Sequence, residues 1–268
     1  MKKTLLLIAF TVMLLPALLS KAGVQTSTCS AQCAYKNNAF SKNEYIAYNL
    51  YFNWKFVWVK AGTATMYTVP SVYQGQSVFR TSLITKSSDA VDKVFMMRDT
   101  ILTYFTDQMV PVYYRKGARE GKRYYVDEMW YTYKNNMVTT NIKHLTAKGA
   151  IEKDKKEYEH CVYDMLNAFQ RIRNYDATKW KVGHVEYVNI AGGSELVNAK
   201  LVYKGKEKVK ADNNKTYDCL ILSYVEKEDG KDHEIVRFYV TNDKRHIPVR
   251  LDMFLKFGSA KAFLSNMK

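Results

Sequence analysis

The chain has 268 residues, of which 47% are hydrophobic and 25% are charged, and its 12 glycines and 4 prolines exclude collagen-like and proline-rich disordered proteins. A chain of this length can bury a substantial core in one large domain or two small ones, so it needs no metal or disulfide scaffold to fold. Its 41 lysines and arginines outnumber the 26 acidic residues, which gives a net charge of +15.

Residues 1–22 are typical of a secretory signal peptide. Two lysines precede an apolar run over 5–19, which is shorter than the roughly 20 residues of a membrane-spanning helix. Small residues at Ser20 and Ala22 then mark a cleavage site. The alternative, an N-terminal membrane anchor, would need a longer apolar run. We expect an exported protein, periplasmic or secreted after cleavage near Ala22, with no transmembrane segment in the mature chain.

The basic excess suggests different partners outside the cytosol than inside it. Removal of residues 1–22 takes away three lysines and no acid, so the mature chain stays strongly basic. Nucleic acid, the usual partner of such a charge in the cytosol, is not expected as a partner of an exported protein. The available polyanions there are lipid headgroups, lipopolysaccharide phosphates and acidic glycans. The alternative is a basic surface that serves solubility alone, because acids are interspersed among the lysines.

Residues 23–42 form an N-terminal polar segment that holds two of the four cysteines. Cys29 and Cys33 lie close together, and an exported protein can form disulfides, so a local Cys29–Cys33 bridge is the pairing we expect. Four cysteines allow three complete pairings. Cys161 and Cys219 can each instead be a small buried hydrophobic residue.

Residues 43–268 carry the pattern of a strand-rich domain. From Ile46 to Trp58 every second residue is apolar, which predicts one long strand with an apolar face. A second alternation, from Ile247 to Phe257, predicts a strand near the C-terminus. Shorter strand-like runs lie between these two, and turn signals such as Asn135-Asn136 and Asp229-Gly230 separate many of them. These runs are 62–69, 77–86, 100–106, 110–116, 122–133, 182–190, 195–204, 216–226 and 233–241.

One segment follows a helical period instead. Its apolar residues recur at offsets of 0, 3, 4, 7 and 10, which predicts an amphipathic helix over about 157–173. These residues are Val162, Met165, Leu166, Phe169 and Ile172. The lysine-rich stretch 141–156 before the helix has no clear period, so we expect a loop or mobile excursion there.

These elements predict a mainly β fold. We expect a single domain over 43–268, built as one large curved antiparallel sheet or incomplete β-barrel, with a helix-containing insertion at about 141–176. The helix would pack on the open side of the sheet, because a curved sheet has to cover its exposed face.

No motif of a known catalytic, metal or cofactor site is present. The five histidines form no His-x-x-x-His or His-Glu-x-x-His pair, and no phosphate-binding glycine motif occurs. Gly192-Gly193-Ser194 lacks the second glycine of a hydrolase elbow and is more typical of a hairpin turn. We therefore expect no enzyme, no metal and no cofactor. An acid pair such as Asp127-Glu128 leaves a hydrolase open as an alternative.

Tyrosine, with 21 residues, is the informative excess. Strands lined with tyrosine and arginine, such as those around Tyr113-Tyr114 and Arg115, can bind sugars, phosphates or protein surfaces. The alternative is that tyrosine simply suits a half-buried pleated surface. Arg250 and Asp252 share one face of their strand, where an ion pair is the expected role.

Six short segments occur in an order that is shared with one known family. They are Glu44-Tyr45-Ile46-Ala47-Tyr48 with Val59-Lys60-Ala61-Gly62-Thr63-Ala64, Arg98-Asp99-Thr100-Ile101, Met109-Val110-Pro111, Tyr163-Asp164-Met165-Leu166-Asn167-Ala168, and Val240-Thr241-Asn242-Asp243-Lys244-Arg245-His246-Ile247-Pro248-Val249-Arg250. In this order they resemble the bacterial exported family catalogued as domain of unknown function 3108, over roughly residues 43–268. The resemblance implies location and architecture but no activity. At the level of fold alone, the chain is also similar to periplasmic lipoprotein-carrier proteins, whose curved sheet and helical lid shelter acyl chains.

Together these observations predict a non-enzymatic exported protein that binds an amphiphilic or anionic cell-envelope component, a lipid or a glycan. Its apolar part would lie in the concavity of the sheet and its anionic part near arginine or lysine. The contact residues we expect are Trp54, Trp58, Arg98, Arg115 and Arg250. One alternative is a structural or assembly protein that binds another envelope protein through its tyrosine-rich strands. The other is a hydrolase whose carboxylates or histidines converge in a cleft.

Overall fold

The computed structural model describes four stretches of the chain: 32–54, 57–192, 195–255 and 258–268. The signal peptide expected over 1–22 lies outside the described residues, and so does Cys29.

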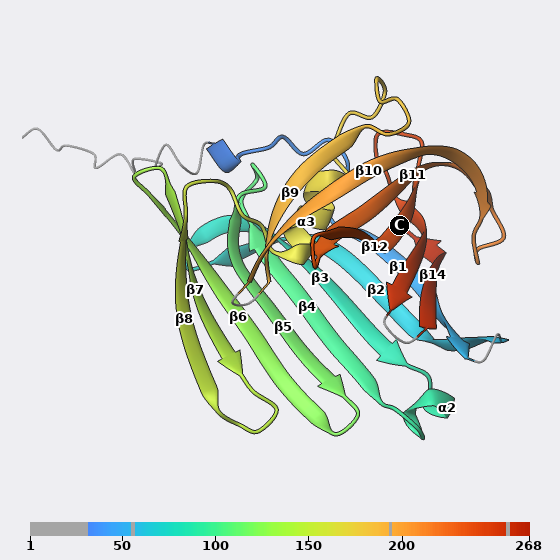
Figure 1. Cartoon of the computed structure of the whole chain (residues 1–268), viewed down its shortest axis with the longest axis horizontal. Coiled ribbons are helices and arrows are strands. Elements are labelled where there is room, and N and C mark those ends of the chain that lie inside the picture. The colour runs from blue at the N-terminus through green and yellow to red at the C-terminus, as the bar shows by residue number, and fades with distance from the viewer. Residues whose placement is uncertain (1–31, 55–56, 193–194, 256–257) are drawn as a thin grey trace, which may run out of the picture.

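Within these stretches, fourteen strands form one antiparallel sheet (Figure 1). Their order across the sheet is β8-β7-β6-β5-β4-β3-β2-β1-β14-β13-β12-β11-β10-β9, so most strands pair with their neighbours in sequence and β1 pairs with β14. The strands are β1 (Glu44–Trp54), β2 (Val57–Tyr73), β3 (Gln76–Ser87), β4 (Met97–Phe105), β5 (Pro111–Glu120), β6 (Arg123–Lys134), β7 (Met137–Leu145), β8 (Ile151–Tyr158), β9 (Val185–Gly192), β10 (Glu195–Lys210), β11 (Thr216–Glu228), β12 (Lys231–Thr241), β13 (Pro248–Leu255) and β14 (Gly258–Met267).

The sheet curves around a single central helix. Its two edge strands, β8 and β9, follow each other in the chain, and the segment that joins them contains α3 (Met165–Ile172). This helix contacts β3 and β4 on one side and β9 on the other (Figure 1). A shorter helix, α2 (Asp89–Asp92), lies between β3 and β4. The predicted fold class is confirmed: one curved antiparallel sheet, not closed into a barrel, with a helix on its open side. We call the face that contacts α3 the inner face and the opposite face the outer face.

Two of the predicted turns are confirmed by their backbone. Asn135 and Asn136 both have positive φ between β6 and β7, and so do Asp229 and Gly230 between β11 and β12. Two-residue hairpins of this kind match the twist of the paired strands, and asparagine, aspartate and glycine tolerate positive φ best.

The long strand predicted from Ile46 to Trp58 is wrong, because the chain reverses within it. β1 ends at Trp54, β2 begins at Val57, and the two strands pair so that Asn53 lies opposite Trp58. The apolar alternation continued through the reversal because apolar residues stand on both sides of it. No glycine, proline or asparagine marks the turn.

The loop predicted over 141–156 is also wrong. Much of this stretch belongs to β7 and β8, which pair from Val138 opposite Tyr158 to Leu145 opposite Ile151. β8 is an edge strand, and its lysines and glutamates occupy both faces, so it shows no apolar alternation. Charged residues on an edge strand block pairing with other chains, which explains the composition.

The helix is shorter than predicted, and one strand was missed. The chain is still extended at Tyr163, which bridges to Ile190, and Asp164 then caps the N-terminus of α3. This is why the helix does not extend back to residue 157. β14 was missed because it begins at Gly258 and carries several small residues, which give a weak apolar pattern.

The predicted Cys29–Cys33 disulfide is wrong: Cys33 is bonded to Cys161 instead. The bond ties the N-terminal segment to the connection before α3 across a sequence separation of 128 residues, and closing a loop of that size contributes about 5 kcal/mol by the chain-entropy argument. Arg171 lies between the rings of Tyr35 and Tyr163, 4.5 and 4.8 Å from their centroids, on the same side of the helix. Cys219, expected as a small buried residue, is a buried free thiol.

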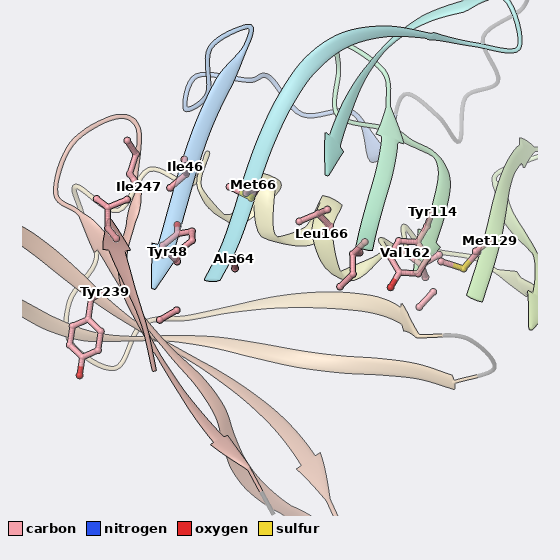
Figure 2. Close-up of a cluster of buried hydrophobic side chains, with 14 of the residues drawn as sticks. Ile46, Tyr48, Ala64, Met66, Tyr114, Met129, Val162, Leu166, Tyr239 and Ile247 are labelled. Atoms are coloured by element: carbon pink, nitrogen blue, oxygen red, sulfur yellow. The ribbon is translucent and has the colours of Figure 1, made fainter. Parts of the chain in front are cut away.

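The main core lies between the inner face and α3 (Figure 2). Ile46, Met66 and Met129 contribute from the sheet, and Val162 and Leu166 contribute from the helix and the residues before it. Each such side chain adds roughly 1.5–3 kcal/mol when it is fully buried. The apolar stripe of α3 therefore fills the curve of the sheet.

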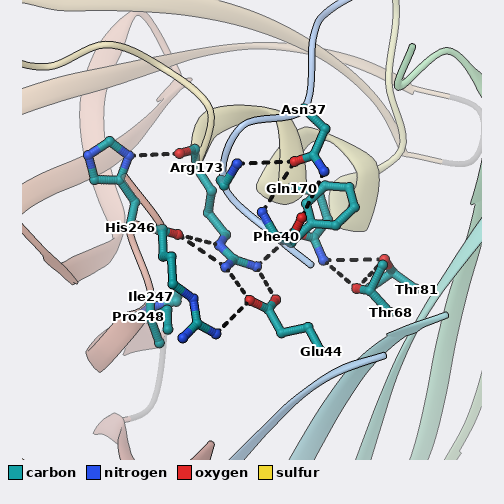
Figure 3. Close-up of polar contacts among 12 residues, drawn as sticks. Asn37, Phe40, Glu44, Thr68, Thr81, Gln170, Arg173, His246, Ile247 and Pro248 are labelled. Atoms are coloured by element: carbon teal, nitrogen blue, oxygen red, sulfur yellow. Dashed lines mark hydrogen bonds and ion pairs between the residues drawn. The ribbon is translucent and has the colours of Figure 1, made fainter. Parts of the chain in front are cut away.

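A buried polar network fixes the C-terminal end of α3 (Figure 3). The Arg173 guanidinium donates to both carboxylate oxygens of Glu44, at 2.7 and 2.9 Å, and to the side-chain oxygen of Gln170 at 2.9 Å. Gln170 in turn donates to Thr68 and Thr81 of the sheet. Because Arg173 and Glu44 are both almost fully buried, this network is structural: its main charges are paired with each other and shielded from solvent.

Candidate functional site

The inner face beyond α3 is divided into an apolar part and a charged part. Leu50, Leu83, Leu251 and Met253 are only partly buried and pack against the edge of the core. The register places Leu50 and Leu251 on either side of Ala262, in one row across β1, β14 and β13. We call these four side chains the apolar band.

The charged part lies on β4 to β7 and consists of six partly buried side chains, which we call the inner cluster: Asp99, Lys116, Glu120, Tyr125, Asp127 and His144. The register explains why they meet. Lys116 lies opposite Ile101 on one side and Asp127 on the other, and Asp127 lies opposite His144. These positions share a face with Ile101, which belongs to the core. The inner cluster therefore lies on the same face of the sheet as the core residues that pack against α3.

Hydrogen bonds link most of the inner cluster. The ring nitrogen Nδ1 of His144 and Oδ1 of Asp127 are 2.5 Å apart. The Lys116 ammonium donates to the Tyr125 hydroxyl at 3.1 Å and also lies over its ring, and that hydroxyl donates to Glu120 at 2.9 Å. The arrangement holds a cation, an aromatic ring and several carboxylate oxygens in fixed positions.

Burial changes the ionisation of the inner cluster. It raises the pKa of Asp99, and the nearby Glu120 raises it further, while Lys116 works against both. Burial works to lower the pKa of Lys116, but its hydrogen bond to Tyr125 and the surrounding acids raise it overall. Oδ1 of Asp99 is buried and has no hydrogen-bond partner within the described part of the chain. The inner cluster thus has more acceptors than donors, which suits a ligand that brings hydroxyl or ammonium groups.

A small pocket lies beside α3. The pocket, between α3, β11 and β12, leaves about 20 Å³ for the centres of water molecules, which is room for about one water. Its lining consists of Phe169, Ile172, Arg173, Leu222, Phe238, Val240 and His246. This pocket is too small for an acyl chain, so a ligand of that size would have to use the exposed part of the inner face.

Two of the five predicted contact residues are held in ion pairs at separate places. Arg98 donates to Asp92 at 3.0 Å and to Ser87 at 2.8 Å, which fastens α2 to β4. Arg250 donates to Asp252 at 2.7 Å, as its position on the strand predicted, and its guanidinium lies 4.7 Å from the centre of a tyrosine ring.

The other three predicted contact residues are also dispersed. Arg115 lies on the outer face of β5, with its guanidinium over Gly117. Trp58 lies near the start of β2, and the Lys261 ammonium is 4.5 Å from the centre of its ring. Trp54 ends β1, and its side chain lies outside the described part of the structure. The structure does not bring the five residues into one site, and their role in binding stays a prediction.

The sequence did contain a signal for the inner cluster. Asp127 and Glu128 were considered as an acid pair, but they point to opposite faces: Asp127 contacts His144 on the inner face, and Glu128 accepts from Tyr113 and Lys143 on the outer face. The same alternation that places core residues on the inner face also places Asp127 there. A charged residue at a position where the alternation predicts a core residue therefore indicates the inner cluster.

A second feature lies on the outer face. Tyr73, Tyr104, Tyr113 and Trp130 form a continuous row of rings across β2, β4, β5 and β6, with successive centroids 5.0 to 5.4 Å apart along the sequence Tyr104, Tyr73, Tyr113 and Trp130. We call this row the aromatic ladder. The hydroxyl of Tyr113 donates to Glu128 at 2.6 Å, so a charged carboxylate lies beside the aromatic ladder.

The described residues hold neither a metal-binding cluster nor a membrane-spanning helix. Across residues 32–54, 57–192, 195–255 and 258–268, no group of three or more histidine, cysteine, aspartate or glutamate side chains is placed to hold a metal ion. Over the same stretches, no helix has the length and apolar character needed to cross a membrane.

Comparisons with known proteins identify the family. A search of curated proteins finds no match. Among solved structures, the chain is similar to a beta-barrel-like protein of domain of unknown function DUF1849 from Brucella abortus. The two share 11% sequence identity and a TM-score of 0.55, over 88% of this chain and 98% of that one, so the likeness is one of fold. The model of the family described as protein of unknown function (DUF3108) matches residues 47–265, and the chain therefore belongs to the DUF3108 family.

Proposed function

We propose that this protein is exported and acts as a non-enzymatic binder of an amphiphilic cell-envelope component, a lipid or a glycan, on the inner face of its sheet. The observation that carries the proposal is the division of that face: the apolar band on β1, β3 and β13 lies beside the inner cluster on β4 to β7. An amphiphile has the same division of apolar and polar parts.

The chemistry of the inner cluster narrows the ligand. Three carboxylates surround a single ammonium group, so an anionic headgroup would meet Asp99, Glu120 and Asp127 at close range. Sugar hydroxyls or an amine would instead satisfy these acceptors, and the Tyr125 ring offers a surface for the face of a sugar. We favour a hydroxyl- or amine-bearing amphiphile over the purely anionic ligand that was the other possibility.

A binding role fits the inner cluster better than a catalytic one. The Tyr125 hydroxyl is shared between Lys116 and Glu120, so these groups are held by one another rather than free to exchange a proton with a substrate. Asp127 contacts Nδ1 of His144, and an aspartate at this nitrogen also orients catalytic histidines. Hydrolysis of an envelope component by the purified protein would therefore contradict a purely binding role.

The test is to identify what the protein retains. The mature protein, beginning at Gly23, is incubated with envelope lipid and glycan extracts and examined by native mass spectrometry. We expect an amphiphile to stay bound, and Asp127→Ala on the inner face to retain at least about tenfold less of it. Glu128→Ala is the matched control, because Glu128 lies on the outer face of the same strand. No retained molecule across a broad panel, or equal losses for the two variants, contradicts the proposal.

The aromatic ladder favours a second candidate, an assembly protein that binds another envelope protein. Flat rows of tyrosine and tryptophan rings are typical of protein interfaces. Cross-linking in an envelope extract tests it: Tyr104→Ser would abolish a specific cross-link, while Tyr124→Ser, an exposed tyrosine on β6 outside the ladder, would keep it. Equal cross-linking by both variants would rule the ladder out as the interface.

A further inference from the structure

Two neighbouring hairpins end in exposed apolar side chains. At the β1–β2 reversal, Val57, Trp58 and Val59 are 61%, 38% and 40% exposed, and at the β13–β14 reversal, Phe254 and Leu255 are 42% and 50% exposed. We call these five side chains the hairpin tips. The four residues 55–56 and 256–257 lie outside the described residues and are not counted in this surface.

The two hairpin tips lie side by side. β1 of one hairpin pairs with β14 of the other, with Phe52 opposite Ala260. Near the end of the second hairpin the contact is close: a Cβ atom on Gly258 would lie 3.3 Å from the Phe52 ring. Figure 1 shows both hairpins on the same side of the molecule, the β13–β14 reversal below the labels of β1 and β14 and the β1–β2 reversal farther to the lower right. The tips therefore form one surface rather than two scattered sites.

The hairpin tips are apolar on both faces of the sheet. Val59 lies opposite Phe52, and Leu255 is two residues after Met253 on the same strand, so both side chains are on the inner side. Trp58 precedes Val59 and Phe254 precedes Leu255, so these two side chains are on the outer side. A folded protein core or an added strand would cover one face or one edge of a hairpin. A surface that is apolar all round suits insertion into an apolar medium.

Two lysines lie next to the hairpin tips, on the side toward the body of the sheet. Lys60 is exposed, three residues from Val57, which is about 10 Å along an extended strand. The Lys261 ammonium lies 4.5 Å from the centre of the Trp58 ring. Arg237 also lies over Phe254, but Glu234 pairs with it and balances its charge. The lysines and Trp58 match the headgroup level of a bilayer, with the other apolar side chains of the hairpin tips below it.

From these observations we propose that the hairpin tips dock the protein on a lipid bilayer that carries anionic headgroups. The apolar side chains supply shallow insertion, and Lys60 and Lys261, together with the basic excess of the chain, supply attraction to anionic lipid. The proposal goes beyond ligand binding on the inner face and does not depend on it. The two are nevertheless continuous in space, because Phe52 and Met253 connect the inner side of the tips to the apolar band.

Co-sedimentation with vesicles tests the docking. The mature protein, without its signal peptide, is mixed with vesicles of phosphatidylethanolamine and phosphatidylglycerol, and separately with phosphatidylcholine vesicles. We expect binding to the anionic vesicles, and about tenfold weaker partitioning for Val57→Asp. Val72→Asp is the matched control, because Val72 is a 69% exposed valine near the other end of the same strand. It should bind within twofold of the unmodified protein.

The contribution of charge is tested in the same way. Lys261→Gln should bind the anionic vesicles about fivefold less and the phosphatidylcholine vesicles unchanged, and added salt should reduce this difference. Equal effects of Val57→Asp and Val72→Asp, or no sedimentation of the unmodified protein, would overturn the docking proposal. A concentration-dependent dimer that Val57→Asp dissociates would overturn it too, and would assign the tips to a second copy of the chain.

Discussion

The buried network at the end of α3 and the inner cluster are both built from ionisable side chains on the same sheet, but their surroundings differ. In the network, Arg173 and Glu44 are each about 1% exposed and bind each other through two hydrogen bonds. In the inner cluster, His144 and Asp127 keep 34% and 26% of their side-chain surface. The first arrangement has its main charges paired in the interior, whereas the second keeps polar atoms available to solvent or a ligand.

The comparison teaches where a function can reside. A closed network holds the helix against the sheet and leaves no place for a ligand. An open cluster contributes little to stability, because partly exposed ion pairs are worth about 0–1 kcal/mol. Stability therefore gives little reason for a charged cluster on the inner face, beside an apolar band.

The largest expected effect breaks the closed network. Glu44→Gln leaves the buried Arg173 without its counter-charge, and we expect a loss of about 3–5 kcal/mol in the free energy of unfolding, measured by urea denaturation. Asp127→Ala should cost less than about 1 kcal/mol in the same measurement. Similar losses for the two variants would mean that the network and the inner cluster do not differ in kind.

A second prediction concerns the other buried carboxylate beside α3. Asp164 accepts from the backbone N–H groups of Leu166 and Asn167 and from Thr103, yet burial raises its pKa to about 7. Because the folded state then holds a proton that the unfolded state releases near pH 4, stability should fall as the pH rises from about 4 to about 7.

The variant Asp164→Asn keeps the helix cap and removes this titration. We expect it to flatten the pH dependence of the free energy of unfolding over that range, by up to roughly 4 kcal/mol at the upper end. A pH profile that is unchanged by the substitution would show that Asp164 is ionised throughout, and that its hydrogen bonds outweigh its burial.

The sequence predicted the architecture because the core strands alternate. The alternations over 46–58 and 247–257 and the shorter strand-like runs between them gave most central strands, and the pairs Asn135-Asn136 and Asp229-Gly230 gave two of the turns. Two strands were lost because their residues give no apolar alternation: β8 is charged on both faces, and β14 begins with small residues although Ala262 and Leu264 lie in the core. Periodicity is silent where the residues that face the core are small or where a strand carries charges on both faces.

The disulfide and the site required information that the linear sequence does not carry. Cys29 and Cys33 are close in sequence, but Cys161 reaches Cys33 only once the segment before α3 has folded across the sheet. Lys116 and His144 meet Asp127 through the register of three strands. No local pattern specifies that register, so the inner cluster could be suspected from polar residues at core positions but not assembled.

Binding on the inner face is the central claim, and one pair of variants tests it most directly. Asp127 and Glu128 are adjacent, partly buried and each paired with one basic side chain, but they lie on opposite faces of β6. The ligand recovered from the envelope extract is titrated into the mature protein, Asp127→Ala and Glu128→Ala by calorimetry. We expect Asp127→Ala to weaken binding about tenfold or more and Glu128→Ala to stay within twofold. Equal affinities for the two variants, or a greater loss for Glu128→Ala, would contradict the claim.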